Sequence, residues 1–170
     1  MTSYTNPPKI ADERPMLDAW LDRHRETLLW KCEGLTDDQL RMRSSPPSPL
    51  SLLGLVRHMS EVERGWFASF AGADASDIYC TEAEPEADFD GVDNADIAAD
   101  FATFRAEVDS ARRLVGKRSL DDTAVIHGRT EFSLRWIMVH MIEEYARHNG
   151  HADLLRERID GVTGDFPGHP

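Results

Sequence analysis

HMIEEYARHNGHADLLRE, residues 140–157, is the stretch that decides how this chain folds. A helix turns by about 100° per residue, so Glu144 and His148 lie one turn apart on the same face. Met141 and Leu155 belong to that face and mark it as the side turned toward the core. Burying an unpaired carboxylate costs several kcal/mol. The sequence therefore predicts a partner for Glu144: an arginine, a hydrogen-bond donor or a metal ion.

The length of 170 residues and the composition, 41% hydrophobic and 29% charged, are those of one soluble globular domain. The chain has no long apolar run that would span a membrane, and Met1–Pro8 lacks the basic-then-apolar order of a signal peptide. We therefore expect a cytoplasmic protein with no membrane partner. Cys32 and Cys80 lie far apart and outside any C-x-x-C pattern, which indicates reduced thiols.

The net charge of −12 argues against nucleic acid as a partner, because the average surface repels a phosphate backbone. Much of this charge lies in residues 74–100, which hold ten acidic residues and no lysine or arginine. Within this block we expect residues 74–94 to be a mobile or irregular surface connection that the core does not need. The spacing of the acidic residues matches no EF-hand, so a calcium site is not expected.

Apolar residues recur at three- and four-residue steps in four stretches, which predicts four amphipathic helices. The helices span about residues 12–34, 49–71, 96–116 and 133–159. Ser48 followed by Pro49 is the expected start of the second helix, and Ser133 is the expected cap of the fourth. The pattern predicts an all-α fold, a four-helix bundle whose ligand and metal sites are built from inward side chains on neighbouring helices.

Shorter features lie between these helices. The segment Thr36–Gln39 has the pattern of a capping box, which predicts a short helical turn. Residues 120–132 suggest one hairpin-like excursion. We expect a single bundle domain over residues 1–170, with loose arms at residues 1–10 and 162–170.

A metal ion held by Glu144 and His148 needs a third ligand from another helix. His58 is the best candidate, because it lies beside the apolar face of the second predicted helix, although a lone histidine there is more often structural. Two histidines, one carboxylate and an open position form the donor set of catalytic zinc sites, and they also accept nickel, cobalt or iron(II). A Glu-x-x-x-His pair also occurs often on helices as a simple hydrogen-bonded pair, so that reading stays open.

The other histidines are weaker candidates. His151 lies on the same helix side, but Glu144, His148 and His151 together extend over about 10 Å of helix axis, too far for one ion. His24 falls on the apolar side of the first predicted helix, where a hydrogen-bonded core histidine is favoured over a ligand. The remaining histidines are expected to be structural or exposed: His127, His140 and His169.

LLGLVRHMSEVERGWF, residues 52–67, together with EEYARHNGHADLLRE, residues 143–157, resembles the DinB/YfiT-like metalloenzymes of actinobacteria. Within that superfamily the chain looks closest to the branch near the N-terminal domain of mycothiol-dependent maleylpyruvate isomerase. The resemblance covers nearly the whole chain and implies a DinB-like bundle with a divalent metal bound by His58, Glu144 and His148. Many members use three histidines, and Glu144 replaces one of them here, as in the isomerase-like branch.

The resemblance also implies a chemistry. Members with known activity use the metal, zinc above all, to bind a small thiol such as mycothiol or bacillithiol, which then adds to an electrophile. The expected function is therefore a metal-dependent thiol S-transferase whose partners are a small-molecule thiol and an electrophile. These 170 residues contain no counterpart of the isomerase's C-terminal domain, so isomerase activity is not expected.

Two questions stay open at this point. The alternative function is a metal-binding bundle without turnover, which serves in stress response or as an interaction module. The oligomeric state is not set by the sequence, and a homodimer stays open. The polar candidates for lining a thiol pocket are Arg57, Tyr145, Asn149 and His151.

Overall fold

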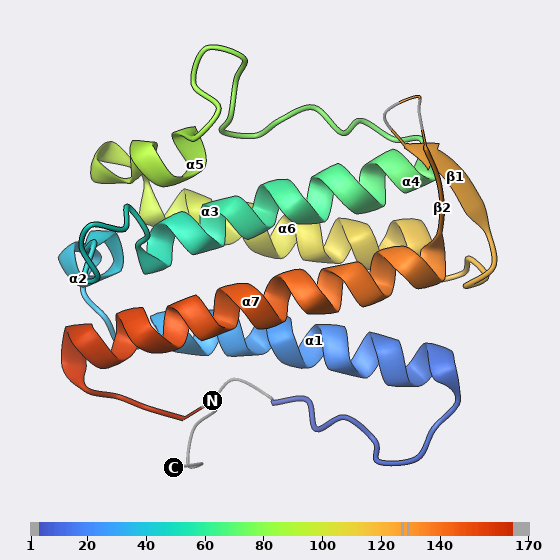
Figure 1. The fold of residues 1–170 in the computed structure, drawn as a ribbon, viewed down its shortest axis with the longest axis horizontal. Helices are drawn as coiled ribbons and strands as arrows, with labels where there is room; N and C mark the ends of the chain where they lie inside the picture. Colours follow the sequence, from blue (N-terminus) through green and yellow to red (C-terminus); the bar gives the residue numbers. More distant parts are fainter. Residues whose placement is uncertain (1–3, 127, 129, 165–170) are drawn as a thin grey trace.

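The computed structural model describes residues 4–126, 128 and 130–164, in which four long helical segments form a bundle (Figure 1). The segments are α1 (Glu13–Cys32), α3 (Leu52–Glu63) continued by η1 (Arg64–Ala68) and α4 (Ser69–Ala71), α6 (Ile97–Val115) and α7 (Leu134–Asp160). Helix α1 packs against α7 and α3 packs against α6, while α3 also contacts α7. The predicted all-α bundle is confirmed.

Shorter elements connect the four segments. They are α2 (Asp37–Arg41), α5 (Ala87–Asp90), η2 (Gly91–Asn94) and the antiparallel strands β1 (Thr123–Ile126) and β2 (Thr130–Ser133). The capping box predicted at Thr36–Gln39 is present at the start of α2. The strands pair as a small hairpin beside α4, where the sequence predicted one excursion. Among the described residues, no helix has both the length and the apolar character needed to cross a bilayer.

Side-chain caps set where two of the long helices begin. The Ser133 hydroxyl accepts a hydrogen bond from the Trp136 N–H at 3.2 Å, as predicted. The predicted cap of the second helix at Ser48 is wrong, because the Ser51 hydroxyl accepts from the Gly54 N–H at 3.1 Å instead. Ser48 is used in a turn, where its N–H donates to the Ser45 carbonyl.

The segment predicted as one long second helix is interrupted by the π-helical turn η1 (Arg64–Ala68). Gly65 lies in this turn, and a glycine weakens the preference for α-helix at its position. Trp66, also in this turn, contacts the aromatic side chains at the start of α7, including Trp136. The wider turn therefore lies opposite the first turns of α7.

An ionic network inside the bundle joins α1, α3 and α7. Arg25 of α1 donates from Nε and Nη2 to the two oxygens of Glu63 on α3, at 2.7 and 2.8 Å. The Tyr145 hydroxyl of α7 donates to Glu63 Oε1 at 2.7 Å. Glu63 and Tyr145 are fully buried, and burial together with the nearby carboxylate raises the pKa of Tyr145. The network ties three helices together at one level of the bundle.

The acidic connection between α4 and α6 differs from the sequence prediction. Residues 81–86 are exposed, as a solvated block should be. In contrast, α5 and η2 pack on α3, and Asp88 and Val92 are buried. The expectation that the core does not need residues 74–94 is therefore wrong, because Val92 belongs to the apolar core and Phe89 packs against it.

The described parts of the two expected arms contact the bundle. Residues 4–12 have no regular secondary structure, but the Thr5 hydroxyl donates to the Glu26 carboxylate at 2.8 Å. At the other end, the Gly164 carbonyl accepts a hydrogen bond from Lys31. Both contacts are with α1, so these parts of the arms lie along that helix.

Candidate metal centre

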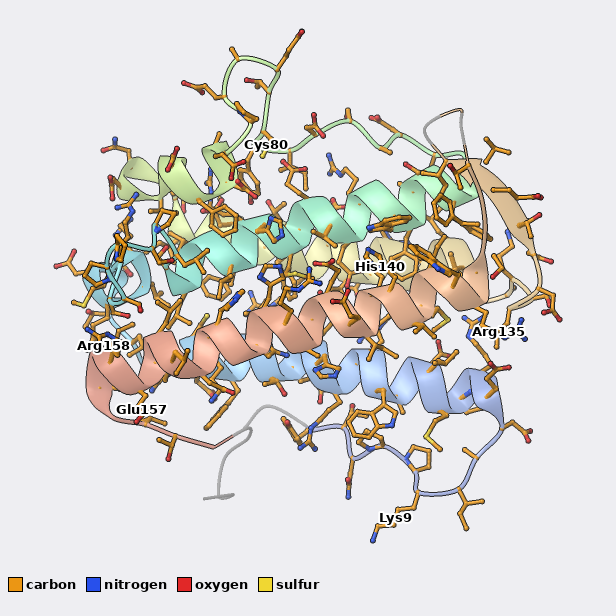
Figure 2. All side chains as sticks on the ribbon, viewed as in Figure 1. Lys9, Cys80, Arg135, His140, Glu157 and Arg158 are labelled. Carbon is orange, nitrogen blue, oxygen red and sulfur yellow. The ribbon has the colours of Figure 1, made fainter. Side chains whose placement is uncertain are left out.

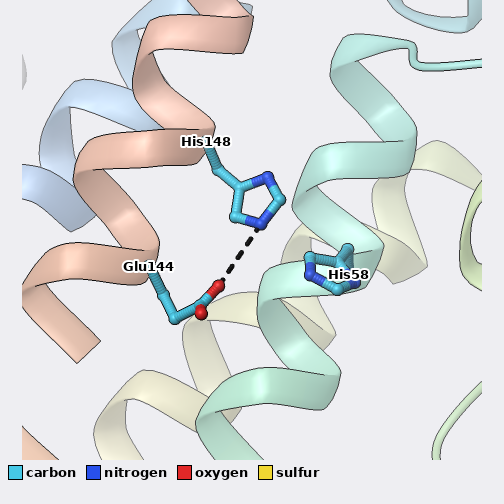
Figure 3. Close-up of side chains that lie close together, drawn as sticks. All are labelled: His58, Glu144 and His148. Carbon is cyan, nitrogen blue, oxygen red and sulfur yellow. Dashed lines mark ion pairs between the residues drawn. The ribbon is translucent and has the colours of Figure 1, made fainter. Parts of the chain in front are cut away.

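His58, Glu144 and His148 meet between α3 and α7 (Figure 3). One ligand atom from each side chain lies within 4.8 Å of the other two. His148 Nε2 is 3.5 Å from Glu144 Oε2, and the centroids of the two imidazole rings are 4.7 Å apart. The structure thus brings together the three residues that the sequence singled out, from helices about 90 residues apart in the chain.

Local sequence explains why these side chains face one another. On α7, Ile137 and Met141 are fully buried and fix which side of the helix faces the bundle. On α3, the buried Leu55 and Met59 do the same, and His58 lies between them at the edge of the buried face. The side chains of His58, Glu144 and His148 are 25%, 15% and 11% exposed. The cluster therefore lies at the rim of the core, where part of each side chain is exposed to solvent.

The environment keeps His148 neutral near pH 7. Burial, followed by the neighbouring His58 and His151, lowers the pKa of His148 to about 4. Its Nδ1 is buried and has no hydrogen-bond partner among the described residues. A neutral imidazole keeps a lone pair on one nitrogen, which is the form that binds a metal. The ring is thus chemically suited to act as a ligand.

The arginine predicted as one possible partner of Glu144 is present, but it comes from the same helix. Arg147 Nη1 lies 3.1 Å from Glu144 Oε1, and Arg147 also contacts Glu143. The Arg147 side chain is half-exposed, and an ion pair of this kind contributes little free energy. Glu144 Oε2 still faces His148, so the carboxylate remains available on the side of the cluster.

His140 lies closer to the cluster than the sequence suggested. Its Nε2 is 3.7 Å from Glu144 Oε1, and it forms a second possible donor group with Glu143 and Glu144. The sequence predicted a structural or exposed role for His140, and the contact with Glu144 arises because the two residues are one turn apart on α7. The predictions for His127 and His169 fall outside the described residues.

Aromatic side chains surround His140. The ring of Trp136 stacks on His140 at 4.9 Å, and Trp66 meets His140 edge-on at 4.7 Å. Phe132 of β2 contacts both tryptophans, and Trp136 is 45% exposed. In Figure 2, His140 lies in the space between α3 and α7. We call this group the aromatic cluster; its members are Trp66, Phe132, Trp136 and His140. His140, the member nearest to Glu144 along α7, lies one helical turn from it.

Most of the polar residues proposed to line a thiol pocket have other roles. Arg57 is buried and binds Asp100 together with two backbone carbonyls. Tyr145 belongs to the core network, and the Asn149 amide donates to the His24 carbonyl at 3.0 Å. Only His151 stays near the cluster, with its ring 5.3 Å from that of His148. For the other three, the pocket prediction is wrong because helix packing buries them elsewhere.

His24 has the role that the sequence favoured, which is a hydrogen-bonded histidine rather than a metal ligand. Its Nδ1 lies 3.2 Å from the Asn149 amide nitrogen, and burial lowers the pKa of its imidazole. It belongs to neither of the two donor groups found among the described residues. His24 is therefore a hydrogen-bonded histidine between α1 and α7.

Asp88 is the important residue of this site that sequence reasoning missed. Its Oδ2 lies 2.8 Å from His58 Nδ1, and the ring of the next residue, Phe89, stacks on His58 at 5.0 Å. Asp88 is one of ten acidic residues in a block without helical periodicity, so nothing in the spacing distinguishes it. The apolar residues Phe89 and Val92 inside that block were the available signal that this part of the connection is packed.

Comparison with known proteins adds one finding. A family model described as mycothiol-S-transferase matches residues 16–161. This range contains all four long helices apart from the first turn of α1. It also contains His58, Glu144 and His148. No curated protein and no solved structure matches the chain.

Proposed function

The chain belongs to the mycothiol S-transferase family, and on that premise we propose that it is a divalent-metal-dependent enzyme. It joins the sulfur of mycothiol, or of a related thiol such as bacillithiol, to a small electrophile. The observation that carries this proposal is the convergence of two histidines and one carboxylate at the rim of the core. In the reaction the thiol loses its proton and a sulfur–carbon bond forms. Either a leaving group departs with the displaced electron pair, or the adduct takes up a proton.

We propose His58, Glu144 and His148 as the residues that hold the ion. Zinc suits two imidazoles and a carboxylate with a further position open to a ligand, and nickel or iron(II) are the alternatives. A divalent ion bound there supplies a positive charge that lowers the pKa of a thiol beside it. The three side chains hold that charge at a partly exposed position, which lets a thiol reach it.

The cysteines of the chain are not required as nucleophiles. Cys32 is buried in the core, and burial raises its pKa to about 12. Burial also raises the pKa of Cys80, with a further contribution from the nearby Asp88 carboxylate. A raised pKa lowers the thiolate fraction at neutral pH, which is the opposite of what a catalytic cysteine needs. The reacting sulfur therefore comes from the small thiol.

The aromatic cluster supplies the apolar surface that an electrophile needs. Trp136 is nearly half exposed and lies two turns before Glu144 on the same helix. Rings of this kind bind a flat apolar molecule through stacking and area burial. We place the electrophile on this surface, with its reactive carbon directed toward the three donors.

The test is a thiol-conjugation assay. Protein stripped with a chelator and protein reloaded with zinc are each mixed with mycothiol and monochlorobimane, and the fluorescent conjugate is followed over time. The proposal expects a rate above the uncatalysed one only with metal, and a loss of that rate in Glu144→Gln. Glu143→Gln is the matched control, since both carboxylates contact Arg147 but only Glu144 faces His148.

The alternative is a metal-binding bundle without turnover. It predicts that the reloaded protein binds zinc but conjugates no faster than the uncatalysed reaction with mycothiol, bacillithiol or simpler thiols. That result would contradict the enzymatic proposal and leave the metal centre in place.

A further inference from the structure

We propose that Asp88 is a positioning residue of the metal centre, which fixes the tautomer and the ring direction of His58. This inference rests on the proposed metal centre and adds to it a residue from the acidic connection. Asp88 lies 30 residues from His58 in the chain, and the two side chains are 2.8 Å apart. The connection therefore does more than join two helices.

The hydrogen bond decides which nitrogen of His58 is free. A neutral imidazole has one N–H and one lone pair, and a carboxylate accepts hydrogen bonds. Nδ1 faces Asp88, so Nδ1 carries the hydrogen and Nε2 keeps the lone pair. Metal-binding histidines are commonly fixed in this way by a carboxylate on the second nitrogen. Asp88 thus prepares His58 to bind an ion through Nε2.

Asp88 is held in place by contacts that a loose surface carboxylate does not have. It is only 3% exposed, and its Oδ1 accepts from the Phe89 N–H at 3.0 Å. Arg57, the neighbour of His58 on α3, donates to the carbonyls of Asp88 and Ala87 at 3.0 and 2.9 Å. The same guanidinium is paired with Asp100 of α6 at 3.1 Å. The backbone that carries Asp88 is therefore fixed to the helical turn that carries His58.

Two glycines allow this close packing. A Cβ atom at Gly91 would lie 3.1 Å from Arg57 Nη2, and a Cβ atom at Gly54 would lie 3.0 Å from the Phe89 ring. A Cβ atom at either position would require the neighbouring side chain to shift by a few tenths of an ångström. With both glycines present, Phe89 packs on α3 and its ring stacks on His58 at an interplanar angle of 29°. His58 is then restrained by a hydrogen bond at Nδ1 and by a ring on its face.

The experiment measures zinc affinity and the His58 tautomer in the full chain. Zinc is titrated against a competing chelator into the metal-free wild type, Asp88→Ala, Asp88→Leu and the control Asp90→Ala. Asp90 is an exposed acid two residues away in the same connection. The tautomer is read from the ring nitrogens of His58 by ¹⁵N NMR on the metal-free proteins. Leucine branches at Cγ as aspartate does but accepts no hydrogen bond, so it fills the buried space that alanine leaves.

We expect both Asp88 variants to bind zinc about 10- to 100-fold more weakly, and Asp90→Ala to stay within about twofold of wild type. In the wild type, His58 should carry its hydrogen on Nδ1, and in both Asp88 variants it should become a mixture of tautomers. Zinc affinity unchanged in a folded Asp88 variant, or a wild-type hydrogen on Nε2, overturns the inference but not the proposed function. A wild type that binds no zinc overturns the proposed metal centre itself.

Discussion

Replacing Glu63 by alanine should lower the free energy of unfolding by about 3 kcal/mol, because it leaves a buried guanidinium without its main partner. Glu63 is fully buried and accepts three hydrogen bonds, two from Arg25 and one from Tyr145. Breaking a buried ion pair by removing one partner typically costs about 3–5 kcal/mol. Asp22 still accepts from Arg25 Nη1 at 3.0 Å, which places the expected cost at the lower end of that range.

The assay is urea and thermal unfolding of chelator-treated protein, followed by circular dichroism. For a chain of this size a loss of about 3 kcal/mol lowers Tm by about 6–12 °C. Tyr145→Phe removes only one of the three hydrogen bonds and should cost about 1.5–3 kcal/mol. The triple variant Arg25→Met, Glu63→Leu and Tyr145→Phe should recover most of the loss, since it removes both charges and also the buried hydroxyl that donates to Glu63. A cost below about 1 kcal/mol for Glu63→Ala would mean that the Arg25 charge is satisfied without Glu63, and that the network does not stabilise the bundle as proposed.

Three further outcomes follow from the same structure. A glutamate-specific protease should cut the folded protein first within the exposed residues 81–86; first cuts in the helices would contradict the fold. A thiol reagent at pH 8 should modify Cys80 slowly and leave Cys32 unreacted until the protein is denatured. Cys32 is buried, and burial raises its pKa to about 12. Fast labelling of both thiols in the native protein would contradict the burial of Cys32. Trp136→Ala should raise KM for an aromatic electrophile by about 2- to 10-fold and leave zinc affinity unchanged; a loss of zinc binding would show that the aromatic cluster supports the metal centre rather than the electrophile.

The sequence predicted the bundle and the three candidate ligands because both depend on helical periodicity. Apolar spacing placed the start of the last helix at Ser133, and the structure has its cap at that residue. Glu144 and His148 share a face of that helix whatever its partners are, so their proximity follows from spacing alone. His58 lies on another helix, and its placement opposite them came from the apolar face of α3.

The features that the sequence did not predict depend on contacts between distant parts of the chain, or on a choice between two residues that are equally suitable as helix caps. Asp88 contacts His58 only after the acidic connection folds back on α3, and no local pattern encodes that step. Ser48 and Ser51 are both good caps, and the choice depends on the proline-rich turn that uses Ser48. The π-helical turn at Gly65 also had no periodic signal of its own.

If His58, Glu144 and His148 together bind one divalent ion, the zinc content per chain must depend on all three side chains. The measurement is elemental analysis after zinc loading and dialysis, on the wild type and on alanine variants of these three residues. Alanine variants of His140 and His151 serve as controls, because both histidines lie near the cluster but outside the proposed ligand set. We predict about one zinc per chain in the wild type and both controls, and a large loss in each ligand variant. Full zinc content in His148→Ala, or loss of zinc in His140→Ala with the three ligands intact, would show that the ion is held by a different set of residues.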